Sequence, residues 1–204
     1  IIDDASPDPA VAAVLRDWLG RGVPGWRFLS NPANLGFVGT ANRGMRLCMS
    51  LGRGDVVLLN SDTEVTRGWL QGLGRCLDSD TTIATATPWS NNGEIVSLPR
   101  FCAANPAPAD AEALAAVVGR SGLAQYPELP TAVGFCMAVA RRAIERIGLF
   151  DETLFGQGYG EENDYSLRAQ AAGLRNVLCD DVYVVHLGGR SFGPLGLQPG
   201  ADSM

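Results

Sequence analysis

Asp62 is a first candidate for chemistry, because it follows the largely apolar run 55–59, which is typical of a buried strand. Ligands of open α/β sheets bind beyond the carboxyl ends of the strands. A carboxylate at that edge can hold a divalent cation against a diphosphate. The preceding Asn60 and Ser61 suit an Asx-type turn equally well. The stretch alone leaves both a cation site and a simple turn open.

Three acids within four residues, Glu161, Glu162 and Asp164, form a second candidate. They follow a glycine-rich loop and begin a predicted helix, where acids also stabilise the helix dipole. Asp164 can pair with Arg168 one turn later, and we assign it to that pairing. Glu161 and Glu162 cannot both face the same partner on a helix, so one of them is placed like a general base at a cleft.

His186 is the only histidine of the chain and ends a predicted strand. A lone histidine often serves only as a structural hydrogen-bonding group, but a metal role becomes equally plausible beside a suspected metal carboxylate. One histidine among oxygen ligands favours manganese over calcium. Arg190 nearby can neutralise a phosphate or simply be solvated.

Two loops near the start have residue types that can contact a nucleotide. Asp3 and Asp4 follow a strand end, where an acid can hydrogen-bond a ribose or a base, although a turn with a helix cap explains them too. The loop with Asn34 and Gly36 opens onto a glycine-rich helix and would bring backbone N–H groups close to a ligand. Asn42 lies inside that helix, where asparagine is a poor helix former. It therefore suggests a use in binding, although an exposed face would tolerate it.

The overall charge limits the kinds of ligand. The chain has 204 residues and a net charge of -6, so we expect no nucleic-acid partner and no general attraction to an anionic membrane. An anionic ligand needs local help from a metal ion, an arginine or backbone N–H groups. The five cysteines are odd in number and well separated, which predicts reduced core residues rather than disulfides or a zinc site.

The elements that must position these residues alternate in type. We expect strands at 1–2, 26–29, 55–59, 83–86, 131–140, 177–178 and 182–185, with a short one at 94–98 inside the long loop 88–109. We expect helices from Pro9 to about Gly20 and over 37–51, 68–77, 110–118, 141–147 and 161–172, with Thr66 as the cap of the third. The alternation predicts a parallel, doubly wound sheet that becomes mixed in the second half.

Taken together, the motifs resemble family 2 glycosyltransferases with the GT-A fold, of the bacterial rhamnosyltransferase-like kind. The residues that carry the resemblance include I-I-D-D-A-S-P-D, N-L-G-F-V-G-T-A-N-R-G, V-V-L-L-N-S-D-T-E-V, V-G-F-C-M-A-V-A, G-Y-G-E-E-N-D-Y-S-L-R-A and V-V-H-L-G-G-R-S-F. The family's opening V-S-I-I-P-type strand is absent, so we expect this chain to be an N-terminally truncated fragment with an incomplete base pocket.

The resemblance implies a role for each candidate. Asp62 matches the last metal-binding acid of the D-x-D motif, whose first position is filled by Asn60, and His186 matches the histidine that completes metal binding. Asp4 matches the acid that touches the base or ribose. Glu162 stands at the position of the catalytic acid or base, Asp164 at that of a supporting acid, and Glu161 is the alternative base. The segments 90–93 and 134–136, with Asn91, Gly134 and Phe135, resemble those that border the sugar and acceptor.

The expected activity is therefore an inverting transfer, dependent on Mn²⁺ or Mg²⁺, from a nucleotide-diphosphate sugar to a glycan or lipid-linked acceptor. It requires positions 62, 162 and 186 to converge on one cleft. We expect one domain over 1–192, with a nucleotide-binding half at 1–87, an acceptor half at 88–192 and an irregular tail at 193–204. The expected location is the cytoplasm, with peripheral association at the inner face of the membrane. A nucleotidyltransferase and a non-catalytic sugar-binding domain are the alternatives.

Overall fold

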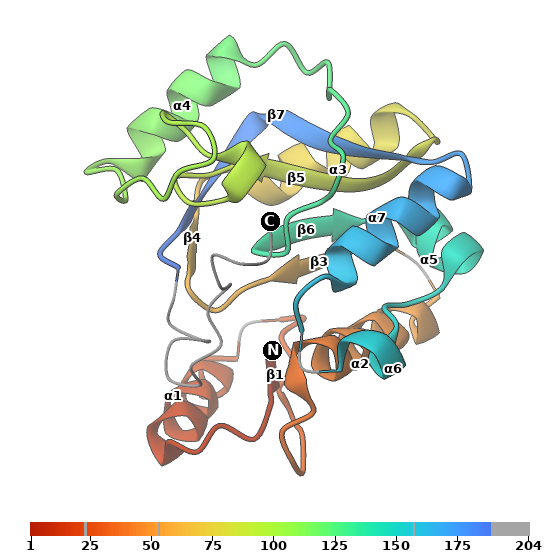
Figure 1. The fold of residues 1–204 in the computed structure, drawn as a ribbon. Coiled ribbons are helices and arrows are strands. Elements are labelled where there is room, and N and C mark those ends of the chain that lie inside the picture. Colours follow the sequence, from red (N-terminus) through yellow and green to blue (C-terminus); the bar gives the residue numbers. More distant parts are fainter. Residues whose placement is uncertain (23, 53, 157, 189–204) are drawn as a thin grey trace. The chain divides into compact units, whose positions relative to one another are not determined.

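The computed structural model describes residues 1–22, 24–52, 54–156 and 158–188 (Figure 1). The chain forms two compact units: one contains Ile1–Arg53 and Leu149–Asp164, and the other contains Gly54–Gly148 and the chain from Tyr165 onward. The predicted boundary between residues 87 and 88 lies inside the second unit. The predicted tail at 193–204 lies outside the described residues. The single-domain organisation stays a prediction.

The first unit is built from β1 (Ile2–Asp3), α1 (Pro9–Gly20), β2 (Leu29–Ser30), α2 (Gly36–Ser50), α6 (Glu152–Phe155) and the first turn of α7 (Glu161–Ala171). β1 and β2 pair in parallel, with Ile2 opposite Leu29. Pro9 begins α1, and the Asp8 side chain accepts a hydrogen bond from Ala10 N. None of the residues of α1 is buried, so its apolar pattern does not mark a core-facing helix in this structure.

The second unit contains a five-stranded sheet with the order β3-β6-β5-β7-β4 (Figure 1). Its strands are β3 (Val56–Leu59), β4 (Thr63–Val65), β5 (Ile83–Trp89), β6 (Cys136–Val139) and β7 (Arg175–His186). β5 and β7 pair in parallel, whereas β6 is antiparallel to both β3 and β5, and β4 is antiparallel to β7. The predicted mixed sheet flanked by helices is confirmed, but its parallel part is smaller than expected.

Several predicted strands differ from the structure. The strands at 177–178 and 182–185 are one long strand, β7, whose pairing with β5 contains a register shift. The strand predicted at 94–98 is wrong, since Glu94–Val96 forms a 3-10 helix, η1. The strand predicted at 131–140 begins only at Cys136, and that predicted at 26–29 begins only at Leu29. β4 escaped prediction because its three residues, Thr-Glu-Val, carry little apolar pattern.

The helices of the second unit are α3 (Trp69–Ser79), α4 (Ala111–Ser121), α5 (Arg141–Ile147) and the remainder of α7. α3 packs on β5 and β7, and α4 packs on β7. Thr66 is not the cap of α3: its hydroxyl donates to the Tyr183 carbonyl, and the helix begins after Gly68, which has a φ of 77°. The core between these helices and the sheet contains Leu73, Leu77, Ile83, Val177 and Val184.

Two further expectations concern the whole chain. Cys76, Cys136 and Cys179 are buried, as predicted, but Cys102 is exposed and Cys48 is half-buried. All five cysteines are free thiols. Within the described ranges, no helix has both the length and the apolar character needed to cross a membrane.

Candidate functional site

Asp62 and His186 lie together at the corner formed by the start of β4 and the end of β7. Thr63, the first residue of β4, pairs with His186, the last residue of β7, and Leu187 N donates a 2.9 Å hydrogen bond to the Asp62 carbonyl. These backbone contacts place the Asp62 Oδ1 atom 3.5 Å from His186 Nε2. The two side chains are largely buried, with exposed fractions of 6% and 16%. The turn at 60–62 therefore also places Asp62 as a candidate metal ligand.

The hydrogen bonds of the imidazole fix its chemistry. Nδ1 lies 2.6 Å from the carbonyl oxygen of Asn92, which can only accept, so Nδ1 carries the proton. In the neutral ring, Nε2 then presents a lone pair toward Asp62. The Asp62 Oδ1 atom is buried and has no hydrogen-bond partner. Two acceptors that face each other are stabilised by a proton, a water molecule or a cation between them, and a histidine tied to a carbonyl through its other nitrogen is the usual arrangement at metal sites.

The donor set therefore fits a divalent ion that takes its other ligands from water and substrate oxygens. Within the described part of the chain, no group of three or more His, Cys, Asp and Glu side chains is placed to hold a metal. Asp62 and His186 would accordingly supply two ligands of the ion. A mixed nitrogen and oxygen set of this kind suits manganese better than calcium.

Stacking and hydrogen bonds from neighbouring residues hold this corner in place. Phe135 stacks on the His186 ring, with centroids 5.1 Å apart, and its carbonyl accepts a hydrogen bond from Asn60 N. The Asn60 carbonyl accepts one from the Thr63 hydroxyl. Ser61 is exposed and Gly134 is half-buried. Of the residues expected near the sugar, Phe135 thus supports a candidate ligand, and Ser61 is open to solvent.

Asn91 has a different role from the one its motif implies. Its side chain is 3% exposed, and its amide group donates to the carbonyls of Asn105 and His186 while accepting from His186 N. Both amide hydrogens are therefore used inside the protein. Asn91 supports the corner and does not offer a donor to a sugar.

In the first unit, Asp4 organises the loop that follows β2. Its Oδ1 atom accepts hydrogen bonds from Asn31 Nδ2 at 2.6 Å and from Leu35 N at 2.8 Å. Asn34 accepts from Gly36 N, and the Asp3 carboxylate accepts from Ser6 N. Asn31 is buried and was not among the predicted site residues; its amide joins Asp4 to Thr40 of α2. Its position two residues after the strand predicted at 26–29 was the available signal.

Asn42 is fully buried, contrary to the expectation of a binding residue on α2. Its amide donates to the Phe150 carbonyl at 2.9 Å and to Glu152 Oε1 at 2.8 Å, and its oxygen accepts from Phe150 N. The hydrogen bond from Asn42, followed by the guanidinium of Arg46, lowers the pKa of Glu152. Although asparagine is a poor helix former, Asn42 serves here to bond the segment 149–155 to α2.

The acidic cluster occupies the first turn of α7, as predicted. Glu161 is 5% exposed, whereas Glu162 and Asp164 are half-buried. Burial, together with the charge of Glu162, raises the pKa of Glu161 to about 7. The neighbouring Glu162 carboxyl therefore favours the protonated form of Glu161 near neutral pH.

The predicted constellation is divided between the two units. Asp62 and His186 lie together in the second unit, and Glu162 lies in the first. Convergence of the three on one cleft stays a prediction. Arg190 lies outside the described residues.

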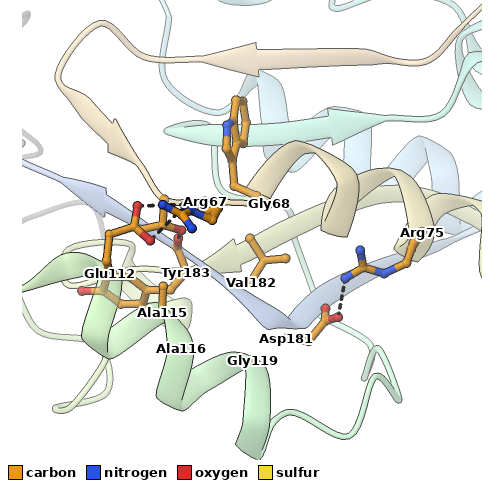
Figure 2. Close-up of a pocket in the computed structure, with 12 residues that line it drawn as sticks. Arg67, Gly68, Arg75, Glu112, Ala115, Ala116, Gly119, Asp181, Val182 and Tyr183 are labelled. Carbon is orange, nitrogen blue, oxygen red and sulfur yellow. Dashed lines mark hydrogen bonds and ion pairs between the residues drawn. The ribbon is translucent and has the colours of Figure 1, made fainter.

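A separate pocket of about 550 Å³ lies among α3, α4 and β7 (Figure 2). The Arg75 guanidinium pairs with Asp181 at 3.2 Å across it, and the Glu112 carboxylate accepts from Arg67 N. None of the predicted site residues lines it. Because both of its carboxylates already have partners, it does not provide a competing metal site.

Comparison with known families identifies the chain. Residues 1–148 match the family described as glycosyl transferase family 2. The chain belongs to this family. Relatives include the uncharacterized proteins Rv1525 of Mycobacterium tuberculosis and Mb1552 of Mycobacterium bovis, each 30% identical over 158 residues. The match covers 76% of the family 2 chain and 55% of each relative, so the chain spans about half the length of the curated relatives it matches.

Solved structures show that the family 2 chain has the GT-A fold. GalNAc-T7 with UDP, GalNAc and Mn²⁺ has a TM-score of 0.68 at 18% identity, covering 91% of this chain and 36% of that protein. The mannosyltransferase PcManGT of Pyrobaculum calidifontis, in complex with GDP-Man and Mn²⁺, has a TM-score of 0.62 at 18% identity, covering 95% and 49%. The family and fold implied by the sequence motifs are confirmed.

Proposed function

We propose that the protein transfers a sugar from a nucleotide-diphosphate sugar to an acceptor hydroxyl. The observation that carries this proposal is the pair of buried acceptors Asp62 Oδ1 and His186 Nε2, 3.5 Å apart, with the imidazole proton held on the opposite nitrogen. Family membership supports it, as do two glycosyltransferases of the same fold that hold UDP or GDP-Man together with Mn²⁺.

Asp62 and His186 would hold Mn²⁺ or Mg²⁺. When bound, such an ion supplies positive charge for the leaving diphosphate. The Asn92 carbonyl keeps the lone pair of Nε2 directed toward the site, and Phe135 supports one face of the ring. Asp4, which already organises the loop 31–36 through its Oδ1 atom, would contact the base or ribose.

Glu162 is the proposed general base of an inverting transfer. The acceptor oxygen forms its bond to the anomeric carbon while the bond from that carbon to the diphosphate oxygen breaks. The hydroxyl proton passes to the carboxylate, and the nucleoside diphosphate leaves. Glu161 is the alternative base, because a pKa of about 7 suits proton transfer at neutral pH. Asp164 would support the base.

The acceptor proposed from the family resemblance is a glycan or a lipid-linked sugar, used at the cytoplasmic face of the membrane. A screen of UDP-, GDP- and dTDP-sugars with Mn²⁺ should find a donor that raises the melting temperature of the protein. The same donor should then release its nucleoside diphosphate. Release of pyrophosphate from a nucleoside triphosphate would indicate a nucleotidyltransferase instead, and binding without turnover would indicate a sugar-binding domain.

Calorimetry separates the metal proposal from the fold. The protein should bind the matching nucleoside diphosphate more tightly with Mn²⁺ than with EDTA, and Asp62→Ala should remove that difference. Glu64→Ala is the matched control, because Glu64 is an exposed acid on β4 two residues from Asp62. Equal affinities with Mn²⁺ and with EDTA in the unmodified protein would refute the metal role.

A further inference from the structure

We propose that Asn91 is a positioning residue that holds His186 in its metal-binding orientation. The inference rests on the proposed function for its metal, but the contacts that support it are independent of any ligand. Asn91 follows β5, whose last residue is Trp89, and it lies beside the end of β7. It does not contact the Asp62 carboxylate, so its effect on a metal would pass through His186 alone.

The side chain of Asn91 continues the hydrogen bonding between β5 and β7 beyond the end of β5. His186 N donates to Asn91 Oδ1 at 2.9 Å, and Asn91 Nδ2 donates to the His186 carbonyl at 3.0 Å. A side-chain amide has the same donor and acceptor as a peptide group, so this pair of bonds continues the pairing of β5 with β7 by two residues. On its other edge, His186 pairs with Thr63 of β4. The backbone of His186 is thus held from both sides.

The next residue, Asn92, orients the ring. Its carbonyl accepts from Nδ1, which leaves Nε2 directed toward Asp62. Fixing the His186 backbone against residue 91 therefore also fixes the distance between the ring and the carbonyl of residue 92. Gly188 closes the arrangement: a Cβ atom added there would lie 2.2 Å from Asn92 Nδ2, and its φ is 69°. A larger residue at 188 would displace the Asn92 side-chain amide.

Asn91 is itself anchored by Asn105 at the other end of the loop. Asn105 N and Nδ2 both donate to the Asn91 carbonyl, and Asn91 Nδ2 donates to the Asn105 carbonyl. Asn105 is 5% exposed and also donates to the carbonyls of Arg100 and Ala103. The long loop between β5 and α4 is therefore closed around the residue that holds the imidazole.

Removal of such a support typically lowers metal affinity by about 10- to 100-fold. Asn91→Ala should therefore weaken Mn²⁺ binding by about tenfold or more. It should also shift the imidazole from the form protonated at Nδ1 to a mixture of both tautomers. Because His186 is the only histidine, the ring ¹⁵N signals of the chain report this directly. Titration with Mn²⁺ alone, followed by calorimetry and by broadening of the same signals, gives the affinity.

Asn176→Ala is the matched control. Asn176 is also buried in the second unit, where it donates to the Ser166 carbonyl and accepts from the Thr85 hydroxyl. Its removal should lower the melting temperature without changing the tautomer or the Mn²⁺ affinity. A merely structural role of Asn91 would make the two variants behave alike, with lower stability but an unchanged imidazole, and that result would overturn the proposal.

Two further outcomes separate this inference from the proposed function. If the unmodified chain binds no Mn²⁺ at His186, the metal role fails. The tautomer shift of Asn91→Ala then still decides whether Asn91 positions the ring. If Asn91→Ala does not fold, Asn91→Leu tests the same arrangement, because it keeps most of the side-chain volume and removes both hydrogen bonds to the His186 backbone. An Nδ1-protonated ring with unchanged Mn²⁺ affinity in folded Asn91→Leu would overturn the inference.

Discussion

Two glycines of α3 allow the packing of this helix on β7 to be measured. Gly72 faces Val182, and a Cβ atom added at Gly72 would lie 2.3 Å from Val182 Cγ2. Gly74 lies two residues further along the helix, and a Cβ atom added there would have no neighbour within 4 Å outside the helix backbone around it. Replacement of each by alanine gives the same gain in helix propensity, about 0.5–1 kcal/mol. The difference between the two variants therefore isolates the steric cost.

The steric cost follows from the stiffness of the partner. Carbon atoms pack at about 3.5–4.0 Å, so the new methyl group or Val182 must move by more than an ångström. Val182 is β-branched and 5% exposed, and it belongs to the core cluster of the second unit. Overpacking of this kind costs about 1–3 kcal/mol. We expect Gly74→Ala to be stabilising and Gly72→Ala to be less stable than Gly74→Ala by about that amount.

Thermal unfolding followed by circular dichroism measures the difference. For a protein of this size, about 1 kcal/mol shifts the melting temperature by about 2–4 °C. Gly72→Ala should therefore melt at least about 2 °C below Gly74→Ala. Val182→Ala combined with Gly72→Ala should remove the steric part of the loss. Equal melting temperatures for the two single variants would show that α3 does not approach β7 as described.

The remaining predictions concern the candidate site. Glu162→Gln should lower turnover by about 10²–10⁴-fold while donor binding persists; wild-type turnover would refute the base assignment. Because the pKa of Glu161 is raised from 4.5 to about 7, the folded state holds a proton that the unfolded state has released between these values. Stability should therefore fall as pH rises through this window, by about 1–2 kcal/mol after allowance for solvent screening. Glu161→Gln should remove that fall, as measured by urea unfolding at pH 5 and pH 8; an unchanged fall would contradict the pKa. Asp62→Asn places a donor toward His186 Nε2, so it should leave the metal-free protein as stable or about 1 kcal/mol more stable while abolishing stabilisation by Mn²⁺. A lower metal-free melting temperature would argue against two facing acceptors.

The sequence predicted the helices well because their signals are local. Pro9 and Asp8 mark the start of α1 through fixed φ and a side-chain cap, and α5 has the predicted bounds Arg141–Ile147. The direction of β6 could not be predicted, since its pairing with both β3 and β5 is decided by tertiary structure. The division of β7 into two strands was wrong because Asp180 and Asp181 interrupt the apolar pattern without ending the strand.

The candidate site was predictable only in part. The resemblance selected Asp62 and His186, which the backbone pairing of β4 with β7 then brings together. Asn92 lies in the predicted segment 90–93, but its role could not be predicted, because it acts through its carbonyl, which every residue type possesses. Asn42 and Asn91 were predicted to bind substrate, but a buried amide has the same sequence signal whether it binds a ligand or another part of the chain.

The first unit has a consequence for synthesis of the protein on the ribosome. Its α2 helix is bonded through Asn42 to Phe150, a partner 108 positions later in the chain. At about 5–20 residues per second, translation delivers that partner on the order of 5–20 s after Asn42 itself. During this interval the amide has to be satisfied by water. Nascent chains that stop short of residue 150 should therefore be targets for chaperones and proteases.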